Sequence, residues 1–93
     1  MKSIGLLGST GSIGVQTLQV IDTFPGEYGI KYLTANKNVK LLAEQALKYN
    51  PDTVCIVQEI FSEELEVLLK NTDITITSGR NALLELAGRN DVD

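Results

Sequence analysis

The chain has 93 residues, of which 43% are hydrophobic and 22% charged, and its formal net charge is −4. These values are typical of one small globular domain and exclude a disordered chain. Histidine is absent and there is a single cysteine, so the sequence offers no imidazole base, no internal disulfide and no cysteine-based zinc site.

The sequence shows no signal peptide and no apolar run of about 18 residues that could span a membrane. The acidic balance argues against nucleic-acid binding. We therefore expect a cytoplasmic protein that binds neither membranes nor nucleic acids.

The charge is unevenly distributed along the chain. Residues 1–50 carry five lysines against three acidic residues, whereas residues 51–93 carry nine acidic residues against three basic ones. The first half is therefore the more favourable place for an anionic ligand. Ordinary solvated helix faces also account for such an asymmetry.

Short β-rich runs alternate with segments of helical spacing along the whole chain. The β-rich runs predict strands at residues 4–7, 28–34, 53–57 and 73–77. Apolar residues spaced by three and four predict helices at residues 13–24, 39–49 and 62–70, and a fourth that ends at Gly88. Side chains that can cap helices precede three of these segments, at Asn38, at Ser62, and at Ser78 or Asn81.

Alternating strands and helices with short connections predict a parallel sheet built by right-handed crossovers. The expected fold class is α/β, a Rossmann-like three-layer arrangement with about four parallel strands and helices on both faces. We expect it to be part of a doubly wound sheet, with strand order 3-2-1-4.

The most informative segment is the glycine loop that joins the first predicted strand to the first predicted helix. Its glycines are Gly8, Gly11 and Gly14, in the order G-x-x-G-x-x-G. In dinucleotide-binding domains such glycines permit a tight turn, close approach of a diphosphate and close helix–strand packing. Thr10 and Ser12 add hydroxyl donors, and Ser12 is also a candidate cap for the helix. The spacing departs from the usual G-x-G-x-x-G, so a tight turn that binds nothing is the alternative interpretation.

A second indication lies at the end of the second predicted strand. NAD-binding domains usually place an acidic residue there, which binds the ribose hydroxyls. Here Lys37 stands between Asn36 and Asn38. A cation attracts a ribose 2′-phosphate that a carboxylate would repel, so the segment favours NADP over NAD. The alternative is that Lys37 is a solvated surface lysine and Asn38 only a helix cap.

Other reactive side chains are expected to be structural. Cys55 lies inside a predicted buried strand and is expected to be a small core residue, because no histidine is present to activate it. Glu63, Glu64 and Glu66 are expected to form a solvated helix face rather than a metal site.

The segment from Lys2 to Ile21, with Leu-Gly-Ser-Thr-Gly-Ser-Ile-Gly at residues 7–14, closely resembles the start of the 1-deoxy-D-xylulose 5-phosphate reductoisomerases. The segment from Ala35 to Asn38 and the Asn50–Pro51 pair fit the same family. The resemblance implies an NADPH-dependent oxidoreductase that is a homodimer and uses a divalent metal (Mg²⁺, Mn²⁺ or Co²⁺). Such enzymes isomerise and reduce 1-deoxy-D-xylulose 5-phosphate to 2-C-methyl-D-erythritol 4-phosphate in non-mevalonate isoprenoid biosynthesis.

Carried over by position, the resemblance assigns seven residues to NADPH. The diphosphate contacts are Thr10, Gly11, Ser12 and Ile13, and the contacts to the phosphorylated ribose are Asn36, Lys37 and Asn38. Many members of the family have glycine at position 36, where this chain has asparagine. The family's metal ligands and substrate-binding groups lie beyond residue 93, so the resemblance implies that residues 1–93 are the N-terminal part of an NADPH-binding domain and are inactive alone.

Two alternatives remain open from the sequence. One is a self-contained small α/β module that binds a nucleotide or a protein partner. The other is a fragment of a different NADP-dependent reductase, such as a semialdehyde dehydrogenase, which shares the G-x-x-G-x-x-G loop.

Overall fold

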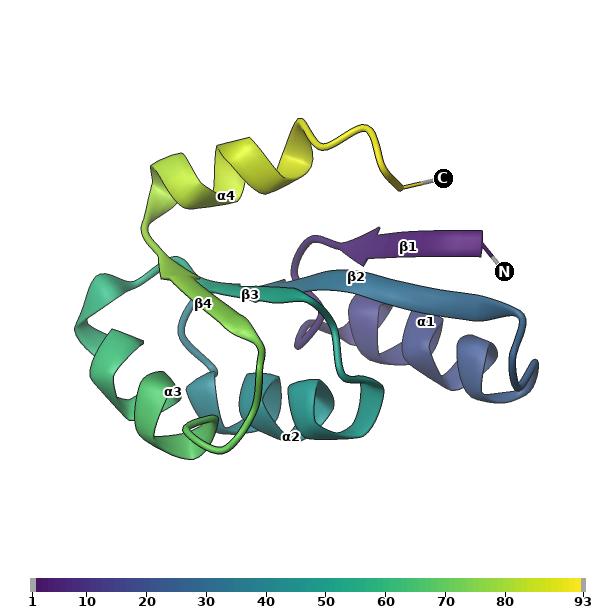
Figure 1. The fold of residues 1–93 in the computed structure, drawn as a ribbon, viewed down its shortest axis with the longest axis horizontal. Helices are drawn as coiled ribbons and strands as arrows, with labels where there is room; N and C mark the ends of the chain where they lie inside the picture. Colours follow the sequence, from purple (N-terminus) through teal and green to yellow (C-terminus); the bar gives the residue numbers. More distant parts are fainter. Residues whose placement is uncertain (1, 93) are drawn as a thin grey trace.

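The computed structural model describes residues 2–92. Within them, strands and helices alternate from one end to the other (Figure 1). The elements in chain order are β1 (Lys2–Leu6), α1 (Ser12–Asp22), β2 (Tyr28–Ala35), α2 (Val39–Tyr49), β3 (Thr53–Ile56), the 3-10 helix η1 (Glu59–Phe61), α3 (Ser62–Leu68), β4 (Thr75–Ser78) and α4 (Arg80–Ala87).

The predicted fold class is confirmed. All three strand pairings are parallel, and together they form a four-stranded sheet. Helices α1, α2 and α3 lie on one face of this sheet and α4 on the other, which makes three layers (Figure 1). None of the helices in the described part of the chain is both long and apolar enough to cross a membrane.

The predicted strand order 3-2-1-4 is wrong. The observed order is β1-β2-β3-β4, with β1 and β4 at the two edges. With right-handed crossovers, the face on which a helix packs determines the direction in which the next strand is added. Helix α3 packs on the same face as α1 and α2, so β4 is added beyond β3 instead of returning to β1 (Figure 1). The expected reversal needs a helix on the opposite face, and the first such helix is α4.

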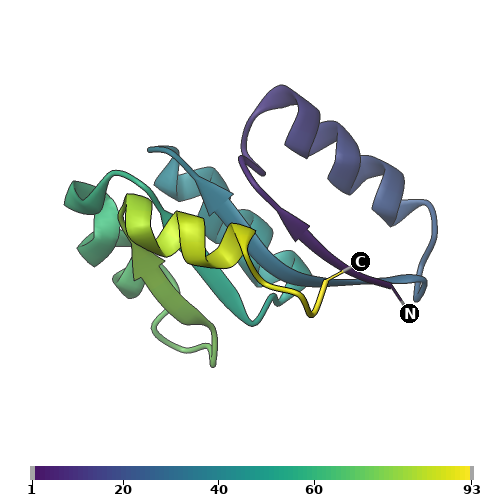
Figure 2. The same cartoon turned by 90° about the horizontal axis from the view of Figure 1, so that it is seen from above.

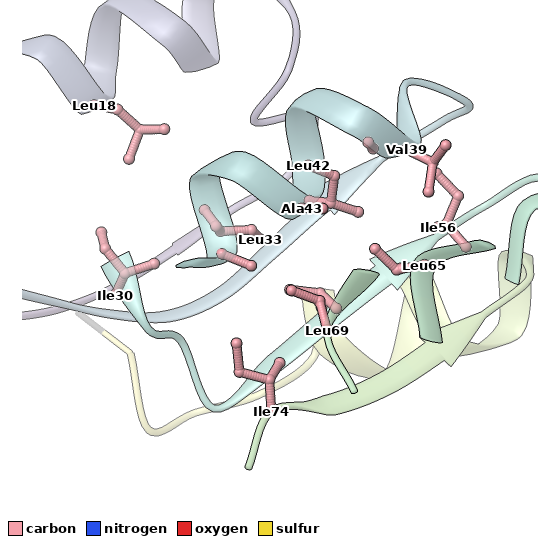
Figure 3. Close-up of a cluster of buried hydrophobic side chains, with 13 residues drawn as sticks. Leu18, Ile30, Leu33, Val39, Leu42, Ala43, Ile56, Leu65, Leu69 and Ile74 are labelled. Atoms are coloured by element: carbon pink, nitrogen blue, oxygen red, sulfur yellow. The ribbon is translucent and has the colours of Figure 1, made fainter. Parts of the chain in front are cut away.

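Two apolar clusters on opposite faces hold the layers together. Alternate residues of β2 point to opposite sides, so Leu33 joins the cluster beneath α1, α2 and α3, whereas Tyr32 joins the one beneath α4. Figure 3 shows the larger cluster, in which strand residues meet leucines of α2 and α3. The smaller cluster contains Tyr32, Cys55 and Leu86. Cys55 is fully buried, as predicted, and burial raises the pKa of its thiol.

Strand β1 is only partly covered. The prediction of a buried strand over residues 4–7 is wrong in this respect: Ile4 and Leu6 are half-buried and Leu7 is 54% exposed. The cause is the strand order, because an edge strand has a neighbour on one side only.

The predicted helix caps are partly confirmed. Asn38 caps α2, since its Oδ1 accepts a hydrogen bond from the Leu41 amide at 3.3 Å. Gly88 ends α4 as expected. The other side-chain caps are wrong, because η1 runs directly into α3 at Ser62 and Gly79 occupies the cap position of α4.

The segment after α4 returns across the sheet toward the amino end of β1 (Figures 1 and 2). Arg89 fixes it there: the guanidinium donates to both carboxylate oxygens of Asp52, at 2.9 and 3.0 Å, and lies 5.8 Å from the centre of the Tyr32 ring. This arrangement keeps the carboxyl ends of the strands, at the other end of the sheet, free of the tail.

Candidate nucleotide-binding site

The glycine loop lies at the carboxyl end of β1, where α/β sheets bind their ligands. Residues 7–10 form a turn, and Gly8 has a φ of +71°, which side chains rarely permit. The Gly11 amide closes the turn by donating to the Gly8 carbonyl at 3.1 Å. The loop therefore has a defined shape before any ligand binds.

Gly11 and Gly14 differ in the space that a Cβ would have. A Cβ at Gly14 would stand 2.5 Å from the Gly8 carbonyl oxygen, so only glycine lets α1 pack this closely on the loop. A Cβ at Gly11 would meet that oxygen only at 3.5 Å, an ordinary contact. The fold tolerates a side chain at Gly11, and the open space above its exposed backbone is available to a ligand.

Three buried polar residues anchor the loop to β2 and α2. The Gly8 amide donates to Thr34 Oγ1 at 2.8 Å, and the Ser9 amide donates to the Thr34 carbonyl at 2.7 Å. The Ser9 hydroxyl lies 2.7 Å from Gln45 Oε1, and Gln45 Nε2 donates to the Ser9 carbonyl at 2.9 Å. These bonds fix the loop against the sheet.

The amino end of α1 has the features of an anion-binding helix terminus. Its cap residue, Gly11, contributes no side-chain hydrogen bond, and its first turn contains no acidic residue. The predicted Ser12 cap is thus wrong. No hydrogen bond within residues 2–92 occupies the amides of Ser12 and Ile13. Free first-turn amides and the helix dipole together favour a phosphate group at this position.

The side chain of Ile13, like the free amides, is open to solvent. Helical spacing assigns this residue to the buried face of α1, but its side chain is 80% exposed, whereas Gly14 and Leu18 are the buried residues of the helix. An apolar side chain left this exposed beside the free amides can cover a bound ligand.

The second group of predicted residues follows β2, the strand next to the glycine loop. Asn36, Lys37 and Asn38 are all exposed there. The Asn36 carbonyl accepts from the Gln58 amide at 2.9 Å, and its Oδ1 accepts from Gln58 Nε2 at 3.3 Å. The Lys37 ammonium makes no ion pair with any residue that the structure describes.

A pocket of about 270 Å³ lies between these two groups, at the carboxyl ends of β1, β2 and β3. Its walls are mostly apolar. The lining residues are Leu7, Gly8, Thr34, Ala35, Asn36, Val57, Arg80 and Leu83. The pocket reaches the glycine loop at Leu7 and Gly8, but of the seven predicted cofactor-binding residues only Asn36 belongs to its lining. The residues from Thr10 to Ile13, together with Lys37 and Asn38, lie outside it.

Several of these residues were missed by sequence reasoning. Thr34 and Gln45 carry no motif, and only their burial and hydrogen bonds show that they hold the loop. Arg80 and Leu83 reach the pocket because α4 packs on the face opposite α1. No periodicity in the sequence indicates which face a helix covers.

The exposure predicted for the acidic residues of α3 is confirmed. Glu63, Glu64 and Glu66 are exposed on α3, as predicted. Across residues 2–92, no three His, Cys, Asp or Glu side chains are grouped so as to hold a metal ion.

A family model described as 1-deoxy-D-xylulose 5-phosphate reductoisomerase matches residues 4–93. Among curated relatives, the reductoisomerase of Chloroherpeton thalassium is 48% identical over 93 residues, which is all of this chain and 24% of that protein. The enzyme of Phocaeicola vulgatus is 41% identical over 92 residues, or 99% of this chain and again 24% of the relative. The chain therefore spans about a quarter of the length of these relatives.

Solved structures agree with the sequence matches. The reductoisomerase of Zymomonas mobilis in complex with NADPH superposes with a TM-score of 0.89 at 35% identity, covering 92% of this chain and 23% of that one. A DOX-P reductoisomerase in complex with NADPH, fosmidomycin and magnesium gives a TM-score of 0.92 at 33% identity, covering 100% of this chain and 23% of that one.

Proposed function

This chain belongs to the 1-deoxy-D-xylulose 5-phosphate reductoisomerase family, and on that basis we propose that residues 1–93 form the N-terminal part of the NADPH-binding domain of such an enzyme. The enzyme would isomerise 1-deoxy-D-xylulose 5-phosphate and reduce it to 2-C-methyl-D-erythritol 4-phosphate in isoprenoid precursor synthesis. NADPH, when bound, supplies the hydride for the reduction. The role of this chain is to hold the cofactor.

The observation that carries the proposal is the uncapped amino end of α1 behind an open glycine loop. A ligand can occupy the open space at Gly11 without disturbing the fold. The amides of Ser12 and Ile13 have no partner within residues 2–92. A cofactor diphosphate would accept hydrogen bonds from these amides, with the hydroxyls of Thr10 and Ser12 as further donors.

Lys37 and its neighbours would bind the adenosine ribose. The Lys37 ammonium is exposed and unpaired in the described chain, so it is available for a 2′-phosphate. Asn38 Oδ1 is engaged in the helix cap, which leaves its amide NH₂ as the group that can donate. Asn36 would contribute through its side-chain amide, which Gln58 already orients.

The sheet topology supports a domain that continues beyond these strands. The outer edge of β1 has no partner strand in the described chain, although the glycine loop lies at its end. Dinucleotides bind where the strand order reverses. Because α4 lies on the face opposite the other helices, a right-handed crossover through α4 would place the next strand on the free side of β1.

The remaining properties of the enzyme follow from family membership and stay proposals. We infer a cytoplasmic homodimer that associates with neither membranes nor nucleic acids. It would use a divalent cation, Mg²⁺, Mn²⁺ or Co²⁺, whose ligands lie outside this chain, since the described residues offer no acidic cluster for it. The chain alone would accordingly be inactive.

The direct test is calorimetric titration of the purified full-length protein with NADPH and with NADH. We expect binding of NADPH and binding of NADH that is at least tenfold weaker, which corresponds to about 1.4 kcal/mol. Equal affinities would remove the 2′-phosphate assignment. Absence of binding would contradict the proposed function and favour the self-contained interaction module. The semialdehyde dehydrogenase alternative is not favoured, since the family match over residues 4–93 is to reductoisomerases.

A further inference from the structure

We propose that Arg80 is a further cofactor-binding residue, whose guanidinium stacks on the adenine ring of NADPH in the pocket beneath α4. The inference rests on the proposed function, because it takes the NADPH diphosphate to lie at the glycine loop. It adds a recognition element that comes from α4, far from both predicted groups in the sequence.

The first argument is the position of the pocket. It extends from Gly8 of the glycine loop past Asn36 at the end of β2 to Val57 after β3. A dinucleotide whose diphosphate lies at the loop and whose ribose lies beside Asn36 carries its adenine within reach of this space. The volume of about 270 Å³ is sufficient for a planar base.

The second argument is the chemistry of the walls. Leu7, Val57 and Leu83 present aliphatic surface, which suits the faces of an aromatic base and not a phosphate group. Arg80 is the one cationic residue in the lining. A guanidinium is planar and weakly hydrated, so it stacks well on aromatic rings.

The third argument is that Arg80 is available. It is exposed, and it forms no ion pair with any residue from 2 to 92, unlike Arg89, which is bound by Asp52 and Asp91. Being the first residue of α4, it projects from a fixed helix rather than from a loop.

The fourth argument separates adenine from phosphate as the target. The carboxylate of Glu59 lies against Gly79, at the amino end of α4, where its Oε1 is 2.5 Å from the point that a Gly79 Cβ would occupy. This negative charge therefore lies beside the residue that precedes Arg80. It disfavours a phosphate at that end of the pocket but leaves a neutral base unaffected.

The experiment is calorimetric titration of the full-length protein and its variants with NADPH and with NADH. The variants are Arg80→Ala, Arg80→Lys and the matched control Asn81→Ala, which changes an exposed neighbour on α4 that does not line the pocket. Thermal denaturation verifies that each variant is folded. We expect Arg80→Ala to weaken NADPH and NADH by the same factor, about tenfold, because stacking does not involve the 2′-phosphate.

The controls distinguish stacking from other causes. Arg80→Lys should remain within about threefold of Arg80→Ala, because an ammonium has no planar face, and Asn81→Ala should bind as the unchanged protein does. A loss confined to NADPH, full rescue by lysine, an equal loss in Asn81→Ala, or unchanged affinity in Arg80→Ala would each overturn the proposal. If the unchanged protein binds neither cofactor, the proposed function fails as well, and the two failures are thereby distinguished.

Discussion

Ser9 and Gln45 are 36 residues apart and bind one another twice: the Ser9 hydroxyl donates to Gln45 Oε1 at 2.7 Å, and Gln45 Nε2 donates to the Ser9 carbonyl at 2.9 Å. Both residues are buried. Because Ser9 belongs to the glycine loop, this pair connects the loop directly to α2.

Replacing Gln45 with Leu should destabilise the protein by about 1–3 kcal/mol, because the change leaves the buried Ser9 carbonyl without its donor and leaves the Ser9 hydroxyl with only the Thr34 carbonyl, at 3.2 Å. Urea denaturation measures the difference. The control is Gln16→Leu, at an exposed position of α1, which should change stability by less than about 0.5 kcal/mol. Equal stability of the two variants would show that the Ser9–Gln45 pair contributes nothing.

Alanine substitutions at Gly11 and Gly14 should separate binding from folding. Gly14→Ala should cost about 1–3 kcal/mol of stability, because its Cβ would stand 2.5 Å from the Gly8 carbonyl oxygen. Gly11→Ala should leave the melting temperature almost unchanged and weaken NADPH binding at least tenfold, since the methyl group would fill the space proposed for the diphosphate. Differential scanning fluorimetry and NADPH titration provide the two measurements. Full NADPH affinity in Gly11→Ala would contradict the proposed position of the diphosphate.

Lys37→Ala should weaken NADPH binding by about tenfold, the loss expected for one charge-assisted contact, and leave NADH binding unchanged. The same titrations measure both. Lys40→Ala, at an exposed position of α2, is the matched control and should alter neither affinity. Equal losses for NADPH and NADH in Lys37→Ala would show that the lysine does not read the 2′-phosphate.

The pair between Arg89 and Asp52 should make stability depend on pH. Hydrogen bonds from the Arg89 guanidinium lower the pKa of the Asp52 carboxyl below its ordinary value of 3.8. A lowered pKa contributes stability above the unfolded value, and this contribution disappears as the pH falls through the folded pKa. Asp52→Asn should therefore cost up to about 1 kcal/mol at pH 7, an amount limited by solvent screening because the carboxylate is half exposed.

Denaturation of Asp52→Asn and the unchanged protein at pH 7 and pH 3 checks this dependence. The difference in stability should shrink at the lower pH. Asp73→Asn, at an exposed acidic residue before β4, serves as the control and should show little difference at either pH. A cost for Asp52→Asn that does not change with pH would exclude the ion pair as its source.

Sequence by itself determined the fold class and the position of the glycine turn. Both follow from local patterns: period-2 and period-3.6 spacing for the elements, and glycines where the backbone must turn, as Gly8 does with its φ of +71°. The Asn38 cap and the burial of Cys55 also follow from local chemistry. These properties depend on near neighbours in the chain.

Only the tertiary structure decided the strand order, the loop anchors and the pocket. Helices α3 and α4 both carry leucines three residues apart, so nothing local reveals that they pack on opposite faces. That choice nevertheless places β4 beyond β3 and brings Arg80 to the end of β2. Gln45 likewise has the sequence properties of a surface residue until packing buries it against Ser9. Contacts between distant segments depend on the direction of the crossovers. The residue pattern of a single helix or strand does not indicate that direction.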